Sequence, residues 1–340
     1  MSTFPLKPCP TTRRKKAREF HKMQTFPPWS TTTICPDYVS TRRLIEVFQV
    51  CVDKFDDVER RGELYGNIEV VDLDGPITLY HRDRANPEHI RANCNVTLTS
   101  PPCAIPFTTG FSINVDLRLC GDLEDIVLSK WQLSWNVYKP EIAKIARGPF
   151  LIDFSDDPKL LLSQASVKNQ SAGYEQPLSA VFESPNGCCI TMYYSIFYHA
   201  VQAQIQIEIV DLGTAPVAEF NFRGSISARY GNFWCGNDSA IKDYCKITLL
   251  KSGDLQLLKS KRCAELQLSR SIIAVPAYSS LIIEADLWDT SGFKIAKGKV
   301  ELAAYNDGYS AGYIRGDANF GIRVIVSWTY GSQVPKYSSF

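Results

Sequence analysis

The sequence predicts an all-β protein of two similar β-sandwich lobes that arose by internal duplication, with short helices in the connection between them. Three observations support this prediction. Apolar and polar residues alternate with period two over much of the chain, two distant stretches repeat one another, and helical periodicity is confined to residues 139–174. Alternation is typical of strands with one buried side, and many short strands joined by turns are typical of sandwiches.

The first segment, residues 1–43, is rich in Pro, Thr and basic side chains and has no sustained hydrophobic period. This composition predicts a flexible leader, because it offers little apolar surface to bury. We expect the first lobe to occupy residues 44–138. Within it, the stretch "GFSINVDLRL" at 110–119 alternates strictly between apolar and polar residues, which predicts a strand with one buried side.

The connection at 139–174 holds the two helical signals. "KPEIAKIAR" (139–147) favours one or two turns, and "DDPKLLLSQASVKNQ" (156–170) has an Asp cap followed by a Pro suited to the first turn. The second lobe is expected at 175–332, with a tail at 333–340.

The clearest alternation lies in the second lobe, in "VQAQIQIEIV" at 201–210. Three isoleucines share one side with Val201 and Ala203, and Gln and Glu fill the other side. Burying the three isoleucines contributes about 5 to 9 kcal/mol before opposing terms. A one-residue slip in pairing would lose this contribution, so the register should be fixed.

The repeat relates residues 100–119 to 270–289. A shift of 170 positions aligns "AIP" at 104–106 with "AVP" at 274–276, and it also aligns Asp116 with Asp286. A shift of 158 aligns Gly66 with Gly224, so the second copy carries 12 extra residues between its glycine and its proline. Because proline removes a ladder donor, we expect Pro106 and Pro276 at equivalent strand ends or edges.

Charge and targeting signals predict an intracellular protein. Lys and Arg total 37 against 36 Asp and Glu, so no overall field favours nucleic acid. There is no apolar run of membrane-spanning length and no signal-peptide h-region, so we expect no transmembrane segment and a cytoplasmic location. The basic cluster at 13–18 leaves nuclear import as an alternative.

No residue pattern indicates a cofactor, a metal site or a reaction. The eleven cysteines have no C-x-x-C spacing and are expected to be thiols. The four histidines lack a recognisable catalytic partner, and neither a G-x-S-x-G motif nor a glycine-rich phosphate loop occurs. We therefore expect a non-catalytic protein without a cofactor; an enzyme with an unrecognised site is the alternative.

Two aromatic, glycine-rich loops are the candidate partner-binding sites. "GNFWCG" (231–236) contains Trp234, and "YNDGYSAGYIRGDANFG" (305–321) contains Tyr305, Tyr309, Tyr313 and Arg315. Rigid rings on an adaptable backbone suit a protein partner, although Tyr and Gly can also build a plain hairpin loop. The sequence predicts neither the partner's identity nor the oligomeric state.

Six segments in this order resemble an uncharacterised plant domain of cereal grasses, which follows the N-glycosylase domain in jasmonate-induced ribosome-inactivating proteins and also occurs alone. The segments are "LIEVFQVCV", "ELYGNIEVVD", "AIPFTTGFSINVDL", "LSAVFESPNGCCITMYYSIFYHAVQAQIQIEIV", "FRGSISARYG" and "LSRSIIAVPAYSSLIIEADLWD". The resemblance implies a link to plant defence or stress and supplies no catalytic residues. It raises an N-glycosylase-associated role, for which Glu88 and Arg91 have the required spacing but a loop-like context.

A further alternative is a C2-like module that binds calcium and phospholipid. The stretch "EADLWDTSGFKIAKGKVEL" is similar to the last strands of such a sandwich, and the sandwich lobes are expected to be of this general type. The available carboxylates are Asp72, Asp74, Asp286 and Asp289. The position that matches Asp289 in the first copy is Leu119, so the first copy lacks part of such a site.

Overall fold

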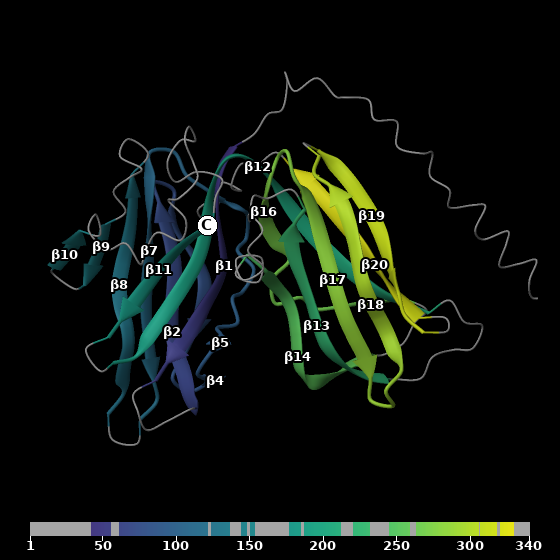
Figure 1. The fold of residues 1–340 in the computed structure, drawn as a ribbon, viewed down its shortest axis with the longest axis horizontal. Coiled ribbons are helices and arrows are strands. Elements are labelled where there is room, and N and C mark those ends of the chain that lie inside the picture. Colours follow the sequence, from purple (N-terminus) through teal and green to yellow (C-terminus); the bar gives the residue numbers. More distant parts are fainter. Residues whose placement is uncertain are drawn as a thin grey trace, which may run out of the picture. The chain divides into compact units, whose positions relative to one another are not determined.

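The computed structural model describes twelve stretches of the chain, all within one compact unit, Ser40–Phe340. The stretches are residues 42–55, 61–121, 124–136, 144–147, 150–153, 177–184, 187–211, 220–231, 245–258, 263–305, 307–317 and 320–329. Every regular element in them is a β-strand (Figure 1), which confirms the predicted all-β class.

The first twelve strands are β1 (Arg42–Lys54), β2 (Arg61–Asp72), β3 (Gly75–Arg82), β4 (Glu88–Arg91), β5 (Cys94–Asn95), β6 (Ile105–Pro106), β7 (Gly110–Leu119), β8 (Ile126–Asn136), β9 (Lys144–Arg147), β10 (Phe150–Asp153), β11 (Pro177–Glu183) and β12 (Cys189–Asp211). The remaining eight are β13 (Phe220–Tyr230), β14 (Ile247–Leu258), β15 (Cys263–Glu265), β16 (Ile272–Pro276), β17 (Ser280–Asp289), β18 (Lys294–Ala303), β19 (Gly308–Arg315) and β20 (Phe320–Thr329).

These strands form three antiparallel sheets. A nine-stranded sheet has the order β19-β20-β12-β1-β5, with β11, β15 and β16 also paired to β12 and β6 paired to β1. A seven-stranded sheet has the order β10-β9-β8-β7-β2-β3, with β4 paired to β2. A four-stranded sheet has the order β14-β13-β17-β18.

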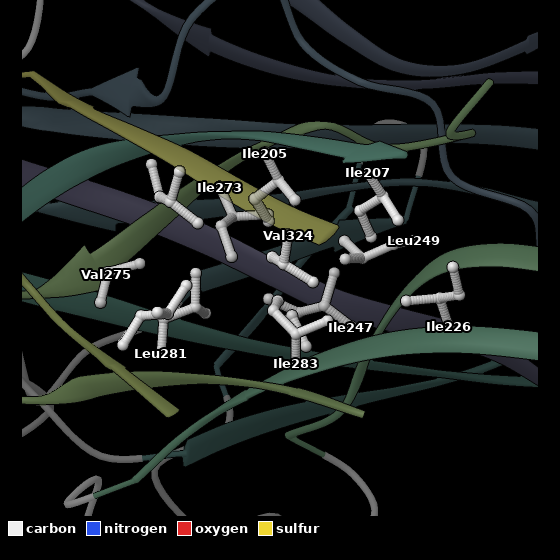
Figure 2. Packing of buried hydrophobic residues seen from close by; sticks show 14 of the residues in the cluster. Ile205, Ile207, Ile226, Ile247, Leu249, Ile273, Val275, Leu281, Ile283 and Val324 are labelled. Carbon is white, nitrogen blue, oxygen red and sulfur yellow. The ribbon is translucent and has the colours of Figure 1, made fainter. Parts of the chain in front are cut away.

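Strand β12 contributes to both hydrophobic clusters of the protein. Its first half pairs with β1 and β11, and together with the seven-stranded sheet these strands form the first cluster. Its second half pairs with β20, β16 and β15, and together with the four-stranded sheet these form the second cluster. Figure 2 shows the second cluster, where Ile205 and Ile207 lie among side chains of the other strands.

The alternation predicted for 201–210 is confirmed with one exception. Ile205, Ile207 and Ile209 are at most 3% exposed. The exception is Gln202, which is buried on the expected polar side. Its amide has a specific partner, described below.

The connection between the expected lobes, residues 139–174, contains strand where the sequence predicted helix. Residues 144–147, expected to be helical, form β9, which pairs with β8. The sheet supplies hydrogen-bond partners to a segment too short to be stable as an isolated helix. The predicted helix at 156–170 lies outside the described residues. Seven buried residues that the sequence assigned to the second lobe pack in the first cluster, because β11 and β12 extend the sheet of β1. They are Ala180, Phe182, Cys188, Ile190, Met192, Tyr194 and Ile196.

Residues aligned by the sequence repeat have matching partners. Pro106 of β6 lies opposite Leu44 of β1, and Pro276 of β16 lies opposite Ala200 of β12. Gly66 and Gly224 have φ of 126° and 133°. A Cβ there would lie 2.1 Å from the carbonyl oxygen of Asp116 or 2.0 Å from that of Asp286. Glycine is therefore required at both positions.

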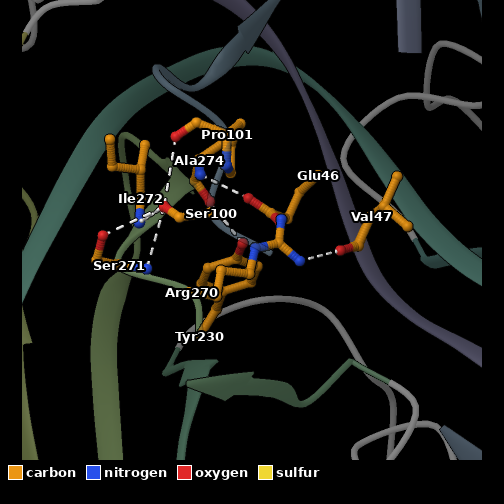
Figure 3. A network of polar contacts seen from close by, with 9 residues as sticks. All are labelled: Glu46, Val47, Ser100, Pro101, Tyr230, Arg270, Ser271, Ile272 and Ala274. Atoms are coloured by element: carbon orange, nitrogen blue, oxygen red, sulfur yellow. Dashed lines mark hydrogen bonds and ion pairs between the residues drawn. The ribbon is translucent and has the colours of Figure 1, made fainter. Parts of the chain in front are cut away.

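A buried ion pair links β1 to the segment that precedes β16 (Figure 3). Glu46 and Arg270 are each 1% exposed, and the Arg270 guanidinium donates to the Glu46 carboxylate and, at 2.5 Å, to the Val47 carbonyl oxygen. The Ala274 N–H donates to the other Glu46 oxygen at 2.6 Å. Burial raises the pKa of Glu46 from its ordinary 4.5 to about 7, although Arg270 and the Ala274 N–H act to lower it. The Tyr230 hydroxyl completes the network by donating to the Ala274 carbonyl oxygen at 2.5 Å.

A second buried hydrogen bond from an alanine N–H to a side chain has its donor in the first half of the chain and its acceptor in the second half. The Ala104 N–H donates to the Gln202 amide oxygen at 2.7 Å, which explains the burial of Gln202. Ala104 and Ala274 are aligned in the sequence repeat, and each donates its N–H to a side chain from the other half of the chain.

Candidate binding face

Strand β19 carries three of the predicted partner-binding residues, and it was expected to be a loop. Tyr309, Tyr313 and Arg315 lie on one side of β19, with Ala311 between the tyrosines. Tyr309 is 80% exposed and Tyr313 is 46% exposed. The opposite side points inward, where Ile314 is 2% exposed.

Local packing explains why this glycine-rich segment is a strand. A Cβ on Gly312 would lie 2.3 Å from Cγ2 of Val300, so the glycine lets β19 pack closely against β18. The Ser310 hydroxyl accepts a hydrogen bond of 2.7 Å from Nε1 of the buried Trp328. The inward side therefore fits the second cluster, and the tyrosines face solvent.

The outward residues of β19 continue across β20 and β12 as three rows. We call this surface the tyrosine face, and its rows are Tyr309–Ser327–Gln204, Ala311–Ile325–Gln206 and Tyr313–Arg323–Glu208. Two of the three residues in the middle row are apolar, and a tyrosine lies at the β19 end of each outer row. Arg315 extends the face at the end of β19.

The charges in the rows of the tyrosine face balance. Nε of Arg323 donates to Oε2 of Glu208 at 2.8 Å, and this hydrogen bond raises the pKa of Arg323 above its ordinary value. The two side chains are 39% and 14% exposed. Because this pair neutralises itself, the three rows carry no net charge.

The other two predicted binding residues do not belong to this face. Tyr305 lies between the end of β18 and the start of β19. Its side chain is partly buried because it packs against the second cluster. Trp234 lies outside the described residues. The period-two pattern of Tyr309, Ala311 and Tyr313 was the sequence signal that could have placed them on a strand.

The carboxylates considered for calcium occupy two different sheets. Asp72 and Asp74 flank the end of β2, where the Asp74 N–H donates to Asp72 at 2.8 Å. Asp289 ends β17 and accepts from the Phe293 N–H and the Ser291 hydroxyl, each at 2.7 Å. No group of three metal-ligating side chains occurs in the part of the chain that the structure describes.

Glu88 and Arg91 lie on strand β4, not in the loop expected from the sequence. Burial of Ile90 fixes the strand against β2, and Glu88 accepts hydrogen bonds from the Thr97 N–H and hydroxyl, at 3.1 and 2.5 Å. Three residues apart on a strand, Glu88 and Arg91 point to opposite sides. They are thus not arranged as two side chains on one helix.

The described thiols are free of disulfides. They are Cys51, Cys94, Cys103, Cys120, Cys188, Cys189 and Cys245. Burial, and then the nearby Asp53, raise the pKa of Cys51 to about 12, which makes its reactive thiolate unfavourable. Within the described stretches, no helix is long and apolar enough to cross a membrane.

Comparisons with known proteins give a family and no function. The family model described as "Domain of unknown function (DUF6598)" matches residues 44–147 and 152–324. No curated protein matches the sequence.

Two solved structures of human GIVD cytosolic phospholipase A2 show a weak likeness. One is in complex with methyl gamma-linolenyl fluorophosphonate inhibitor and terbium chloride, the other with methyl gamma-linolenyl fluorophosphonate. In each case the identity is 8%, the TM-score is 0.21, and the alignment covers 86% of this chain and 32% of the phospholipase chain. The chain thus spans about a third of their length, and a TM-score this low supports no statement about fold or function.

Proposed function

Because the chain belongs to the DUF6598 family, which is defined without a function, we propose one from the residues themselves: it is a non-catalytic binding protein that holds a protein partner on the tyrosine face. The observation that carries this proposal is the exposure of Tyr309 and Tyr313, 80% and 46%, on one side of a strand packed against the core.

The chemistry of the face favours a protein over a charged ligand. Tyrosines provide large contact areas with few rotatable bonds, and Tyr and Arg are enriched among the residues that dominate protein interfaces. The apolar middle row between the tyrosines would be desolvated by a partner, and the self-neutralised Arg323–Glu208 pair needs no charged counterpart. Arg315 supplies a polar anchor at the rim.

Affinity capture with matched variants tests the proposal. The double variant Tyr309→Thr and Tyr313→Thr keeps residues suited to a strand, and Tyr278→Thr removes a tyrosine that is 61% exposed elsewhere. We expect quantitative mass spectrometry to show proteins that the wild type and the Tyr278 variant capture and the double variant loses. Identical partners for all three would exclude the tyrosine face.

We also propose that the two sandwich-like halves are copies of one ancestral C2-like unit. The matched pairings of Pro106 and Pro276, the paired glycines and the reciprocal bonds of Ala104 and Ala274 support this. In this proposal the boundary between copies falls inside β12, since β11 and the start of β12 complete the first copy as β19 and β20 complete the second. Superposition of residues 42–200 on 201–329 in a crystal structure tests it.

The link to plant defence rests on the sequence resemblance alone and stays a proposal. Its test is whether the transcript and protein rise after jasmonate treatment of the source tissue. A constant level would remove the link without affecting the tyrosine face.

A further inference from the structure

The outward face of the four-stranded sheet is rich in cations, although the chain as a whole has a net charge of only +1. Besides Lys294, which is paired with Asp317, six cations and three carboxylates are described on this face, and these nine groups sum to +3. The cations are Arg223, Arg229, Lys246, Lys251, Lys297 and Lys299, and the carboxylates are Glu284, Asp286 and Glu301. We call this surface the basic face.

Its carboxylates neutralise only half of its cations. Arg229 and Lys246 share Glu284, at 2.8 and 4.0 Å. Lys297 lies 3.8 Å from Asp286, and the Glu301 carboxylate accepts from a serine hydroxyl instead of a cation. The three remaining cations have no ion pair among the described residues. They are Arg223, Lys251 and Lys299, and all are exposed.

Strand pairing spreads these cations over a broad layer. Lys251 of β14 lies opposite Ser225, which lies opposite Asp286, which lies opposite Lys297 of β18. At about 4.8 Å between strands, this row spans roughly 14 Å. A layer of separated cations matches an extended anionic surface better than a single small anion.

The corresponding face of the first half carries a smaller excess of cations. Its described outward charges on β2, β4, β7 and β8 are Arg61, Arg91, Arg118 and Lys130 against Glu63, Glu69 and Asp116. The aligned Asp116 and Asp286 each pair with a lysine of the neighbouring strand, Lys130 at 3.6 Å and Lys297 at 3.8 Å. The larger excess of cations therefore belongs to the second half and is not a requirement of the fold.

An exposed aromatic turn lies beside the basic face. Phe293, in the turn between β17 and β18, is 60% exposed, and hydrogen bonds from its N–H and from Ser291 to Asp289 hold the turn. Lys294 and Lys297 lie over the Trp288 ring at 5.5 and 5.3 Å. Aromatic rings beside lysines are typical of segments that rest in the headgroup region of a bilayer.

We propose that the basic face and the Phe293 turn form a docking surface for the anionic leaflet of a phospholipid bilayer, without calcium. The unpaired cations face the headgroups, and Phe293 enters the interface. A nucleic acid fits less well because Trp288 is already engaged, its Nε1 donating to Asp286 at 2.6 Å and its ring covered by lysines. This surface is separate from the tyrosine face, so each proposal can fail alone.

Vesicle sedimentation in EDTA tests the proposal, with phosphatidylcholine vesicles that contain either 30% or no phosphatidylserine. We expect pelleting only with phosphatidylserine, and a loss of binding in about 0.5 M NaCl because salt screens the attraction. The variant Arg223→Gln, Lys251→Gln and Lys299→Gln should lower the partition coefficient about 100-fold, since each basic residue contributes a factor of about five.

The control removes the same charge from the first half, as Arg61→Gln, Arg91→Gln and Lys130→Gln, and should bind within twofold of the wild type. Phe293→Ser leaves every charge in place and should weaken binding at least threefold. Circular dichroism verifies that the variants fold, and the single variant Lys299→Gln, with an expected fivefold loss, provides a milder change. Equal pelleting without phosphatidylserine, a requirement for calcium, or wild-type binding by the basic-face variant would overturn the proposal.

Discussion

The buried pair of Glu46 and Arg270 makes a sharp prediction about stability. The variant Arg270→Met keeps an apolar stem of similar length and removes the guanidinium. Two acceptor atoms then lose their donor, Oε1 of Glu46 and the Val47 carbonyl oxygen, while Oε2 of Glu46 keeps the Ala274 N–H. Glu46 is 1% exposed, so water cannot replace the lost partner.

The size of the effect follows from this burial. At about pH 8, where Glu46 is ionised, removing one member of a buried ion pair costs about 3 to 5 kcal/mol, because the other charge stays buried without compensation. Adding Glu46→Gln to Arg270→Met removes that charge, and the amide oxygen can still accept from the Ala274 N–H, as Gln202 accepts from Ala104. We expect the double variant to regain about 2 kcal/mol or more of the free energy of unfolding.

Urea unfolding followed by circular dichroism measures these free energies, provided that the slopes stay constant. Arg323→Met is the matched control, because it breaks the partly exposed pair with Glu208 and should cost no more than about 1 kcal/mol. A loss below about 1 kcal/mol for Arg270→Met, or a double variant as unstable as the single one, would refute the reasoning.

The remaining predictions concern pH, backbone and core. Burial raises the pKa of Glu46 from 4.5 to about 7, so between these pH values the folded state holds a proton that the unfolded state releases. The stability that this group contributes should therefore fall as pH rises from about 4.5 to 7, and Glu46→Gln should flatten that part of the pH profile of the free energy of unfolding. Gly66→Ala and Gly224→Ala should each cost more than about 2 kcal/mol, because the new Cβ would clash with the facing carbonyl oxygen; chemical unfolding measures this, and a near-neutral effect would contradict the close approach. Ile207→Ala should cost about 2 to 5 kcal/mol in the same assay, and a loss under 1 kcal/mol would argue against its place in the core.

Alternation and composition were sufficient to predict the all-β class. The side that Ile205, Ile207 and Ile209 bury follows from their spacing, because a strand turns every second residue to the same side. The connection was predicted less well, since a weak helical pattern at 144–147 was overridden by pairing with β8. Propensity over so short a segment is a weak guide when a sheet edge is available.

Two features of the fold and site had no adequate signal in the sequence. Arg270, the partner of Glu46, lies 224 positions away along the chain, and neither residue belongs to a sequence motif that indicates a buried ion pair. The tyrosines were identified but placed in a loop, because glycines usually mark turns. Here Gly312 instead makes room for Val300, a contact that only the packed structure reveals.

Site-specific photo-crosslinking from Ala311 tests the central claim most directly, because this exposed position lies between Tyr309 and Tyr313. A photoreactive residue at 311 should yield a defined crosslinked protein in the native tissue extract, and the same residue at the exposed Thr78 on β3 should not. No product from position 311, or the same products from both positions, would contradict a partner on the tyrosine face.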